Sequence, residues 1–139
     1  MNIISLDFGE STGMVRYSHP SNYLTDSRTV TPNMAYEVVR MAAEMEVVET
    51  ILVERFPRNT SELDPDTITA YENTLRLWRV NPGLGVVLIS PGEWKPVAKA
   101  RKWKNKELKS KHERDAYNMM RYWFFSNKIM DIGDKHAPS

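Results

Sequence analysis

The order of hydrophobic patterns along the chain constrains its fold more than any other feature of the sequence. Three short apolar or alternating segments come first, and Glu10-Ser11-Thr12-Gly13 is expected to be the hairpin turn between the first two. Apolar strands then alternate with segments of helical spacing. In chain order we expect strands at 2–8, 13–17 and 23–30, a helix at 32–47, a strand at 50–54, a helix at 67–80, a strand at 85–89 and a helix at 110–126.

This order of elements predicts an α/β fold. Three antiparallel strands followed by parallel strands would form a mixed five-stranded sheet flanked by helices. A chain of 139 residues is enough for one hydrophobic core. We therefore expect one domain over 1–126, followed by a C-terminal tail, 127–139, that lacks periodicity.

Each expected helix has an apolar stripe that predicts its buried face. Methionines fill gaps more often than they bind ligands, so the methionine-rich stripe of the first helix indicates core or dimer packing. The predicted inward residues are Met34, Val38, Met41, Ala42 and Met45 in the first helix, Ile68, Tyr71, Leu75 and Trp78 in the second, and Ala116, Met119, Met120 and Trp123 in the last.

Composition excludes several classes of protein. The chain has no cysteine, which excludes disulfides, thiolate zinc sites and cysteine nucleophiles and is typical of a reducing cytoplasm. No run approaches the roughly 18 consecutive apolar residues of a membrane span. The first residues include no basic segment and meet an acid at Asp7, so we expect no signal peptide. A cytoplasmic location follows, in the host cytoplasm if the chain is viral.

Positive charge is concentrated in one segment. Residues 95–114 contain nine Lys or Arg against two Glu, a net charge of +7, so the remainder carries −6 of a total of +1. Such a distribution is typical of a local surface for a polyanion on an otherwise acidic protein. The alternative is a solvated lysine-rich loop. Trp94 and Trp103 lie among these cations, and they are interpreted either as faces on which bases stack or as core or dimer residues.

Two acids, Asp7 and Glu54, each follow a strongly apolar strand. Neighbouring strand ends converge on one crevice of an α/β sheet, where ligands bind. Two carboxylates brought together there repel each other unless a cation neutralises them, and Mg²⁺ prefers such oxygen ligands. The alternative for each acid alone is structural: Asp7 capping a turn, and Glu54 a solvent-facing charge.

A third pair of candidate ligands, His112 and Asp115, opens the last helix. Their i, i+3 spacing places both side chains on one helical face, the one that carries Met119 and Trp123. An imidazole and an acid on an inward face are costly unless they are paired or bind a metal. The alternative is a surface histidine and a first-turn acid favoured by the helix dipole.

These segments together resemble one family. Asp7-Phe8-Gly9-Glu10-Ser11-Thr12-Gly13 resembles the first-strand motif of RuvC-type Holliday junction resolvases, particularly bacteriophage members, although Phe8 replaces their usual proline. Ile51-Leu52-Val53-Glu54 resembles their fourth-strand glutamate. His112-Glu113-Arg114-Asp115-Ala116 resembles the (Asp/His)-x-x-Asp-Ala signature of their last helix. The three motifs occur in the family's order, whereas the stretch between Glu54 and the last helix matches only in outline.

The resemblance implies an RNase H-like fold and two-metal hydrolysis of phosphodiester bonds, with two Mg²⁺ or Mn²⁺ ions per active site. Asp7 would bridge both ions, Glu54 and Asp115 would each complete one site, and His112 would ligate a metal or orient the attacking water. It also implies branched DNA, above all four-way junctions, as the substrate, a homodimer, and a bacteriophage origin.

The resemblance further suggests which residues contact DNA. Resolvases carry a lysine near the scissile phosphate after the fifth strand, where Lys95 is the first candidate here, ahead of Lys109 and Lys111. An aromatic residue shortly after the glutamate can wedge into the junction, and Phe56 lies near that place; simple packing of Phe56 is the alternative. The complete set of predicted DNA-binding residues is Lys95, Lys99, Arg101, Lys102, Lys104, Lys109, Lys111 and Phe56.

Three other functions compete with the resolvase. The first is an RNase H-like nuclease acting on other nucleic acids, such as flaps, RNA/DNA hybrids or RNA precursors. The second is an actin-like ATPase or sugar kinase, which shares the Asp-x-Gly motif but needs two such subdomains. The third is an inactive binding module, which would have no need of mutually repelling acids.

Overall fold

The computed structural model describes residues 2–18, 23–56, 63–104 and 107–127 of the 139-residue chain. The predicted 127–139 tail therefore lies outside the described residues except for Asn127, as does Lys106 of the basic segment. The division into a domain and a tail stays a prediction.

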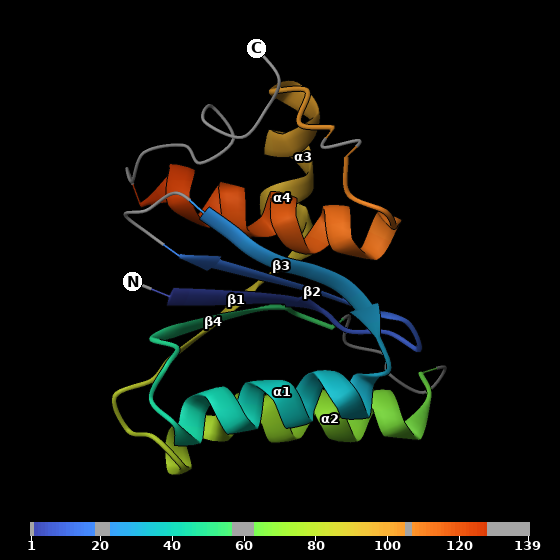
Figure 1. Ribbon diagram of the computed structural model, residues 1–139. Helices are drawn as coiled ribbons and strands as arrows, with labels where there is room; N and C mark the ends of the chain where they lie inside the picture. The colour runs from blue at the N-terminus through green and yellow to red at the C-terminus, as the bar shows by residue number, and fades with distance from the viewer. Residues whose placement is uncertain (1, 19–22, 57–62, 105–106, 128–139) are drawn as a thin grey trace.

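A five-stranded mixed sheet forms the centre of the molecule, as predicted (Figure 1). The strand order is β3-β2-β1-β4-β5, with β1, β2 and β3 antiparallel and with β4 and β5 parallel to β1. Its strands are β1 (Asn2–Asp7), β2 (Thr12–Ser18), β3 (Tyr23–Val30), β4 (Thr50–Glu54) and β5 (Gly85–Ile89).

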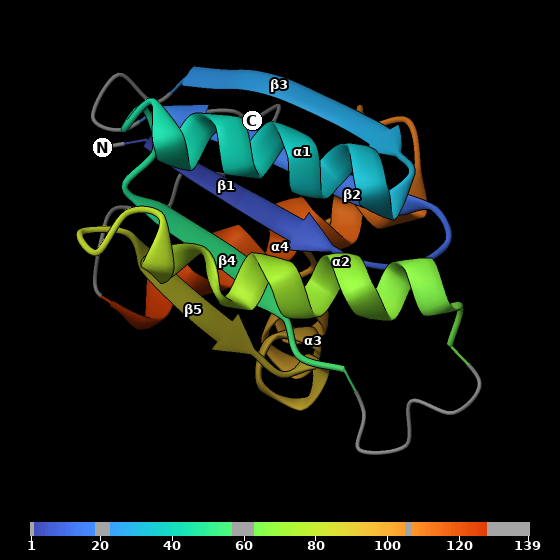
Figure 2. The same ribbon diagram turned by 90° about the horizontal axis from the view of Figure 1, so that it is seen from below.

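Helices cover both faces of this sheet (Figures 1 and 2). One face is covered by α1 (Pro32–Glu44) and α2 (Pro65–Leu75), and the other by α3 (Pro91–Ala100) and α4 (Lys111–Ser126). A short 3₁₀ helix, η1 (Leu77–Arg79), follows α2. Side chains alternate along β1, so that Ile4 and Leu6 join the core beneath α1 whereas Ile3 joins the core beneath α4.

The predicted buried faces of the first two helices are wrong in part. Met34, Met41 and Met45 are 53%, 53% and 67% exposed, and of the predicted α1 stripe only Ala42 is buried. The residues that α1 does bury are mostly small: Pro32, Ala35, Val39, Ala42 and Ala43. Small side chains allow the helix to lie close to the sheet and to α2, so the largest apolar residues stay outside.

The second predicted helix is shorter than expected. α2 ends at Leu75 and the chain continues as η1, whose tighter turn changes which side chains face inward. Leu77 is consequently buried, whereas the predicted inward Trp78 is 53% exposed. The last helix is close to its prediction, because Ala116, Met119 and Met120 are fully buried.

The sequence prediction missed α3. Ser90, Pro91 and Glu93 explain how a helix starts where a break was expected: the Ser90 hydroxyl donates to Glu93 Oε1 at 3.1 Å, and proline is well suited to the first helical position. Pro96 lies within α3, where it lacks the N–H for one helical hydrogen bond. Proline and glycine at the start and this internal proline conceal the helix in the sequence.

Candidate active site

The sheet brings the two predicted acids to one edge and one face. Leu6 of β1 pairs with Val53 of β4 in parallel register, so Asp7 and Glu54 occupy the next positions at neighbouring strand ends. Alternation along each strand places Asp7 on the same face as Ser5, and Glu54 on the same face as Leu52. That is the face covered by α3 and α4.

The first turn of α4 lies against the start of β2. Gly13 of β2 is paired with Asp7 of β1, and a Cβ at Gly13 would collide with the backbone carbonyl of His112. Only glycine leaves room for this approach. His112 Nδ1 lies 3.3 Å from Asp7 Oδ2, so β1 and α4 bring these two residues into contact.

Hydrogen bonds from the sheet hold α4 in this place. Glu113, which is 3% exposed, accepts hydrogen bonds from the Ser27 hydroxyl at 2.7 Å and the Thr29 hydroxyl at 2.9 Å. The buried Ser5 hydroxyl donates to the Ala116 carbonyl at 2.7 Å. Because Glu113 and Ala116 are neighbours of His112 and Asp115, these bonds set the position of both candidate ligands. Sequence reasoning missed Glu113 as a positioning residue.

The three carboxyl groups of the site influence one another. Burial raises the pKa of Asp7, and the nearby charge of Asp115 raises it further. Burial and Asp7 raise the pKa of Glu54 to about 7, against opposing effects of Trp94 and Lys95. Burial also raises the pKa of Asp115, although Lys95 and other cations oppose it. Three acids that disfavour one another's ionisation form a site where a cation would be stabilising.

The chemistry of the donor set fits magnesium or manganese. Three carboxylates and one imidazole supply oxygen and nitrogen donors, and Mg²⁺ often takes only one or two carboxylates and several waters. As the side chains lie, no group of three or more His, Asp or Glu residues among the described part of the chain is arranged to hold one metal ion. The ligand roles of Asp7, Glu54, His112 and Asp115 therefore stay predictions.

Trp94 is part of the site, which the sequence did not indicate. Its indole Nε1 donates a hydrogen bond to Glu54 Oε2 at 2.7 Å, across 40 residues of sequence. Trp94 is 2% exposed and Trp103 is 7% exposed, so both are core residues and are not available for stacking on bases. A tryptophan beside a lysine has no sequence signal that would pair it with a strand-end glutamate.

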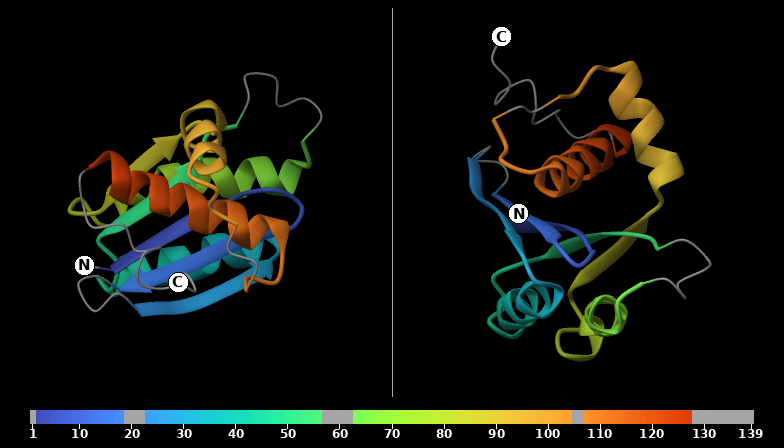
Figure 3. Two further views of the ribbon diagram at one scale, coloured as in Figure 1. Left: turned by 90° about the horizontal axis from the view of Figure 1, so that it is seen from above. Right: turned by 90° about the vertical axis from the view of Figure 1, so that its right-hand side faces the viewer.

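The predicted cationic surface begins at this site. Lys95 Nζ lies 5.6 Å from the centroid of the Trp94 ring, and its charge lowers the pKa of all three acids. Lys95 and Lys99 also line a shallow hollow of about 520 Å³ on the exposed side of α3. Figures 1 and 3 show α3 beside α4 on the same side of the sheet. The other exposed candidates are Lys99, Arg101, Lys102, Lys104, Lys109 and Lys111.

Phe56 packs against the opposite layer. Its ring stacks on Tyr71 of α2, with centroids 4.0 Å apart and planes at 15°. Tyr71 in turn contacts Phe8 edge-on at 6.2 Å. This agrees with the packing alternative, and a role of Phe56 in DNA binding stays a prediction.

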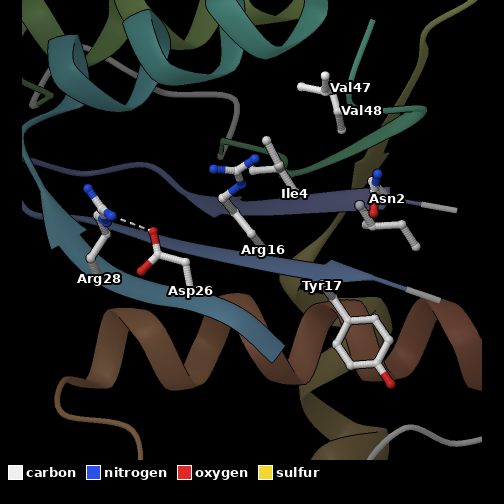
Figure 4. A pocket seen from close by; sticks show the side chains of 9 residues that line it. Asn2, Ile4, Arg16, Tyr17, Asp26, Arg28, Val47 and Val48 are labelled. Atoms are coloured by element: carbon white, nitrogen blue, oxygen red, sulfur yellow. Dashed lines mark ion pairs between the residues drawn. The ribbon is translucent and has the colours of Figure 1, made fainter. Parts of the chain in front are cut away.

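A separate cavity of about 460 Å³ lies at the opposite end of β1 and does not include the four predicted ligands. It is lined in part by Asn2, Arg16 and Arg28, and Arg28 is paired with Asp26 at 2.6 Å. Figure 4 shows Arg16 directed toward α1 and Tyr17 directed toward α4, so these two neighbouring side chains lie on opposite faces of the sheet.

The architecture and the strand order define an RNase H-like fold. The solved structures that resemble it include the T. thermophilus RuvC in complex with a Holliday junction substrate, with a TM-score of 0.69, and a Thermus thermophilus RuvC structure, with a TM-score of 0.60. Each is 16% identical, and 92% of this chain aligns with 96% and 97% of those chains. No family model and no curated protein sequence matches the chain.

Within the described ranges, none of the helices has the length and apolar character needed to cross a membrane.

Proposed function

We propose that the protein is a metal-dependent endonuclease that hydrolyses phosphodiester bonds in branched DNA, with four-way junctions as its main substrate. The observation that carries this proposal is the meeting of Asp7 and Glu54, at neighbouring strand ends, with His112 of α4 and with Lys95 of α3. The similarity of the fold to a RuvC bound to a Holliday junction substrate supports the choice of DNA.

Asp7, Glu54, His112 and Asp115 would hold two Mg²⁺ or Mn²⁺ ions. Such a pair of ions activates a water for attack on phosphorus and stabilises the leaving oxygen. Asp7, the central acid, would be shared between the two sites, with Glu54 on one side and Asp115 on the other. His112 would complete one site or orient the attacking water through its ring nitrogen.

Lys95 and the exposed cations after it would bind the DNA backbone. The charge of Lys95 lowers the pKa of Asp7 and Glu54, and we expect its ammonium to contact a phosphate bound at the site. The remaining cations extend along and beyond α3, where they would neutralise further phosphates of the junction arms. Binding would therefore weaken as the salt concentration rises.

A homodimer is part of this proposal. A four-way junction presents two equivalent strands, and two-fold symmetric cleavage requires two active sites related by the same symmetry. Paired nicks placed symmetrically in a junction would support the dimer. A single unpaired nick would instead support action on another branched substrate, such as a flap.

The test is a panel of four substrates in Mg²⁺ or Mn²⁺: a four-way junction, a flap, an RNA/DNA hybrid and plain duplex DNA. We expect fastest cleavage of the junction. Asp7→Asn is expected to abolish cleavage, because the amide lacks the charge of the central acid. It is expected to leave junction binding largely intact. Near-normal cleavage by Asp7→Asn would overturn the proposed site. If the hybrid or the flap is cleaved faster than the junction, that nucleic acid becomes the proposed substrate in place of the junction.

A further inference from the structure

The hydrogen bond between Trp94 and Glu54 links the core to the proposed metal site. Glu54 Oε2 accepts the indole N–H at 2.7 Å. Trp94 belongs to the core cluster that also contains Leu52, Ile89 and Ala98, and it is almost fully buried. The donor is consequently fixed by packing, because a buried tryptophan cannot change its rotamer without displacing its neighbours.

The bond distinguishes the two oxygens of the Glu54 carboxylate. Oε2 uses one lone pair for the indole, whereas no donor among the described residues bonds to Oε1. A hydrogen bond of this length to an ionised group is strong and fixes the rotation of the carboxylate. Oε1 thus has both lone pairs available to a ligand, whereas Oε2 has only one.

We propose that Trp94 is a positioning residue that makes Glu54 present a single oxygen to a metal ion, and that it thereby favours Mg²⁺ and Mn²⁺ over Ca²⁺. The inference rests on the proposed function, because it assumes that Glu54 is a metal ligand. Trp94 itself contacts neither the metal nor DNA. It acts only through the orientation of Glu54.

The preference follows from the different coordination of these ions. Mg²⁺ requires near-octahedral geometry at 2.0–2.1 Å and is satisfied by one oxygen from each carboxylate. Ca²⁺ is larger, takes six to eight ligands, and often binds both oxygens of one carboxylate. A carboxylate with one oxygen held by an indole is suited to the smaller ion. Removing the indole N–H would reduce the preference for Mg²⁺ over Ca²⁺.

Trp94→Phe removes the N–H but retains an aromatic ring in the core and beneath Lys95. The DNA-free protein would be titrated by calorimetry with Mg²⁺, Mn²⁺ and Ca²⁺ at pH 8. We expect Mg²⁺ and Mn²⁺ affinity to fall about 10-fold or more, as is typical when a partner of a metal ligand is removed. Ca²⁺ affinity is expected to fall less, so that the Mg²⁺/Ca²⁺ affinity ratio declines.

Trp103→Phe is the matched control. Trp103 lies in the same core cluster as Trp94 and suffers the same loss of packing, but it contacts Arg101, Arg121 and Phe125 instead of Glu54. Trp103→Phe is expected to leave the Mg²⁺/Ca²⁺ affinity ratio unchanged. In a Glu54→Ala background, Trp94→Phe is expected to have no further effect on that ratio, because no side-chain oxygen is left for the indole to orient.

The outcomes separate this inference from the function on which it rests. If Asp7→Asn weakens metal binding and Trp94→Phe leaves the ratio unchanged, the inference is overturned and the proposed function survives. If Asp7→Asn leaves metal binding unchanged, both fail. Should Trp94→Phe not fold, the wild-type protein still gives an answer by NMR. The indole N–H resonance of Trp94 is identified as the one that shifts in Glu54→Gln. We expect it to stay protected from exchange with solvent when Mg²⁺ is bound. Loss of this protection would overturn the inference.

Discussion

The first turns of α4 and α3 both reach the candidate site, but they are anchored in different ways. α4 is held by residues outside the site: Glu113 binds Ser27 and Thr29 of β3, and the Ser5 hydroxyl binds the helix backbone. α3 is held to the site by a bond to a site residue itself, from Trp94 to Glu54.

The two helices therefore differ in what their contacts support: those of α4 hold the fold together, and that of α3 orients a candidate metal ligand. The hydrogen bonds of Glu113 and Ser5 do not depend on the charge of the four candidate ligands, although His112 of the same helix also contacts Asp7 at 3.3 Å. The anchor of α3 depends on Glu54, whose charge changes with pH and with a bound cation. Substitutions around α4 are therefore expected to lower mainly the free energy of unfolding. Substitutions around α3 are expected to change mainly the affinity for metal ions.

The largest effect is expected from Gly13→Ala, which attacks the anchoring of α4. The new Cβ would collide with backbone atoms of His112, which cannot move aside as a flexible side chain can. We expect the free energy of unfolding to fall by about 3 kcal/mol, at the upper end of overpacking effects, and cleavage to be lost. Urea denaturation and a junction-cleavage assay measure the two effects.

Gly92→Ala is the matched control for this change. Gly92 is exposed in the first turn of α3, and a Cβ there meets no atom within 4 Å. Alanine also favours the helix by up to about 1 kcal/mol over glycine. A Gly13→Ala protein as stable and active as Gly92→Ala would contradict the close contact between β2 and α4.

A smaller loss of stability is expected from Glu113→Ala. The substitution leaves the hydroxyls of Ser27 and Thr29 without their carboxylate partner and is expected to cost about 2 kcal/mol. Cleavage is expected to fall as well, because Glu113 lies between His112 and Asp115. Thermal unfolding and the cleavage assay measure both effects.

Glu107→Ala, an exposed glutamate of the preceding segment, is the control for Glu113→Ala. The pH dependence gives a second check. Burial would raise the pKa of Glu113, but hydrogen bonds from Ser27 and its neighbours lower it overall. The contribution of Glu113 is thus present above its unfolded pKa and is lost as the pH falls through its lowered pKa. Equal stability of Glu113→Ala and Glu107→Ala at pH 7 would show that Glu113 does not anchor α4.

The contrast between α4 and α3 also marks how far the sequence could predict the site. Asp7 and Glu54 were recognisable because each ends an apolar strand, and parallel strand ends meet at one edge. His112 and Asp115 were recognisable by helical spacing. These signals are local, and they were sufficient to place Asp7 beside His112.

The parts that were missed depend on contacts between distant segments. Glu113 looked like one more charge of a basic, solvated stretch, because its partners lie on β3, far earlier in the chain. α3 was concealed by Pro91, Gly92 and Pro96, and without the helix the indole of Trp94 had no predicted direction. Periodicity likewise misjudged α1, whose close packing selects alanines for the interior over the larger methionines.

The smallest expected effect concerns the charge of Glu54 and tests the anchoring of α3. The pKa of Glu54 is raised to about 7, from 4.5, so the folded metal-free protein holds this proton more tightly than the unfolded chain. The stabilisation is complete below pH 4.5 and is lost as the pH rises through about 7. Because solvent screens a partly exposed group, we expect a loss of about 1 kcal/mol between pH 6 and 8.

Glu54→Gln isolates this contribution, since its amide stays neutral and its oxygen can still accept from Trp94. In the absence of metal, the melting temperature of the wild type is expected to fall by about 3–5 °C relative to that of the variant between pH 6 and pH 8. Mg²⁺ is expected to reverse the difference at pH 8, because only the ionised carboxylate attracts the cation. Parallel melting curves for the two proteins across this range, with or without Mg²⁺, would mean that the charge of Glu54 is not coupled to folding and that α3 is anchored as independently as α4.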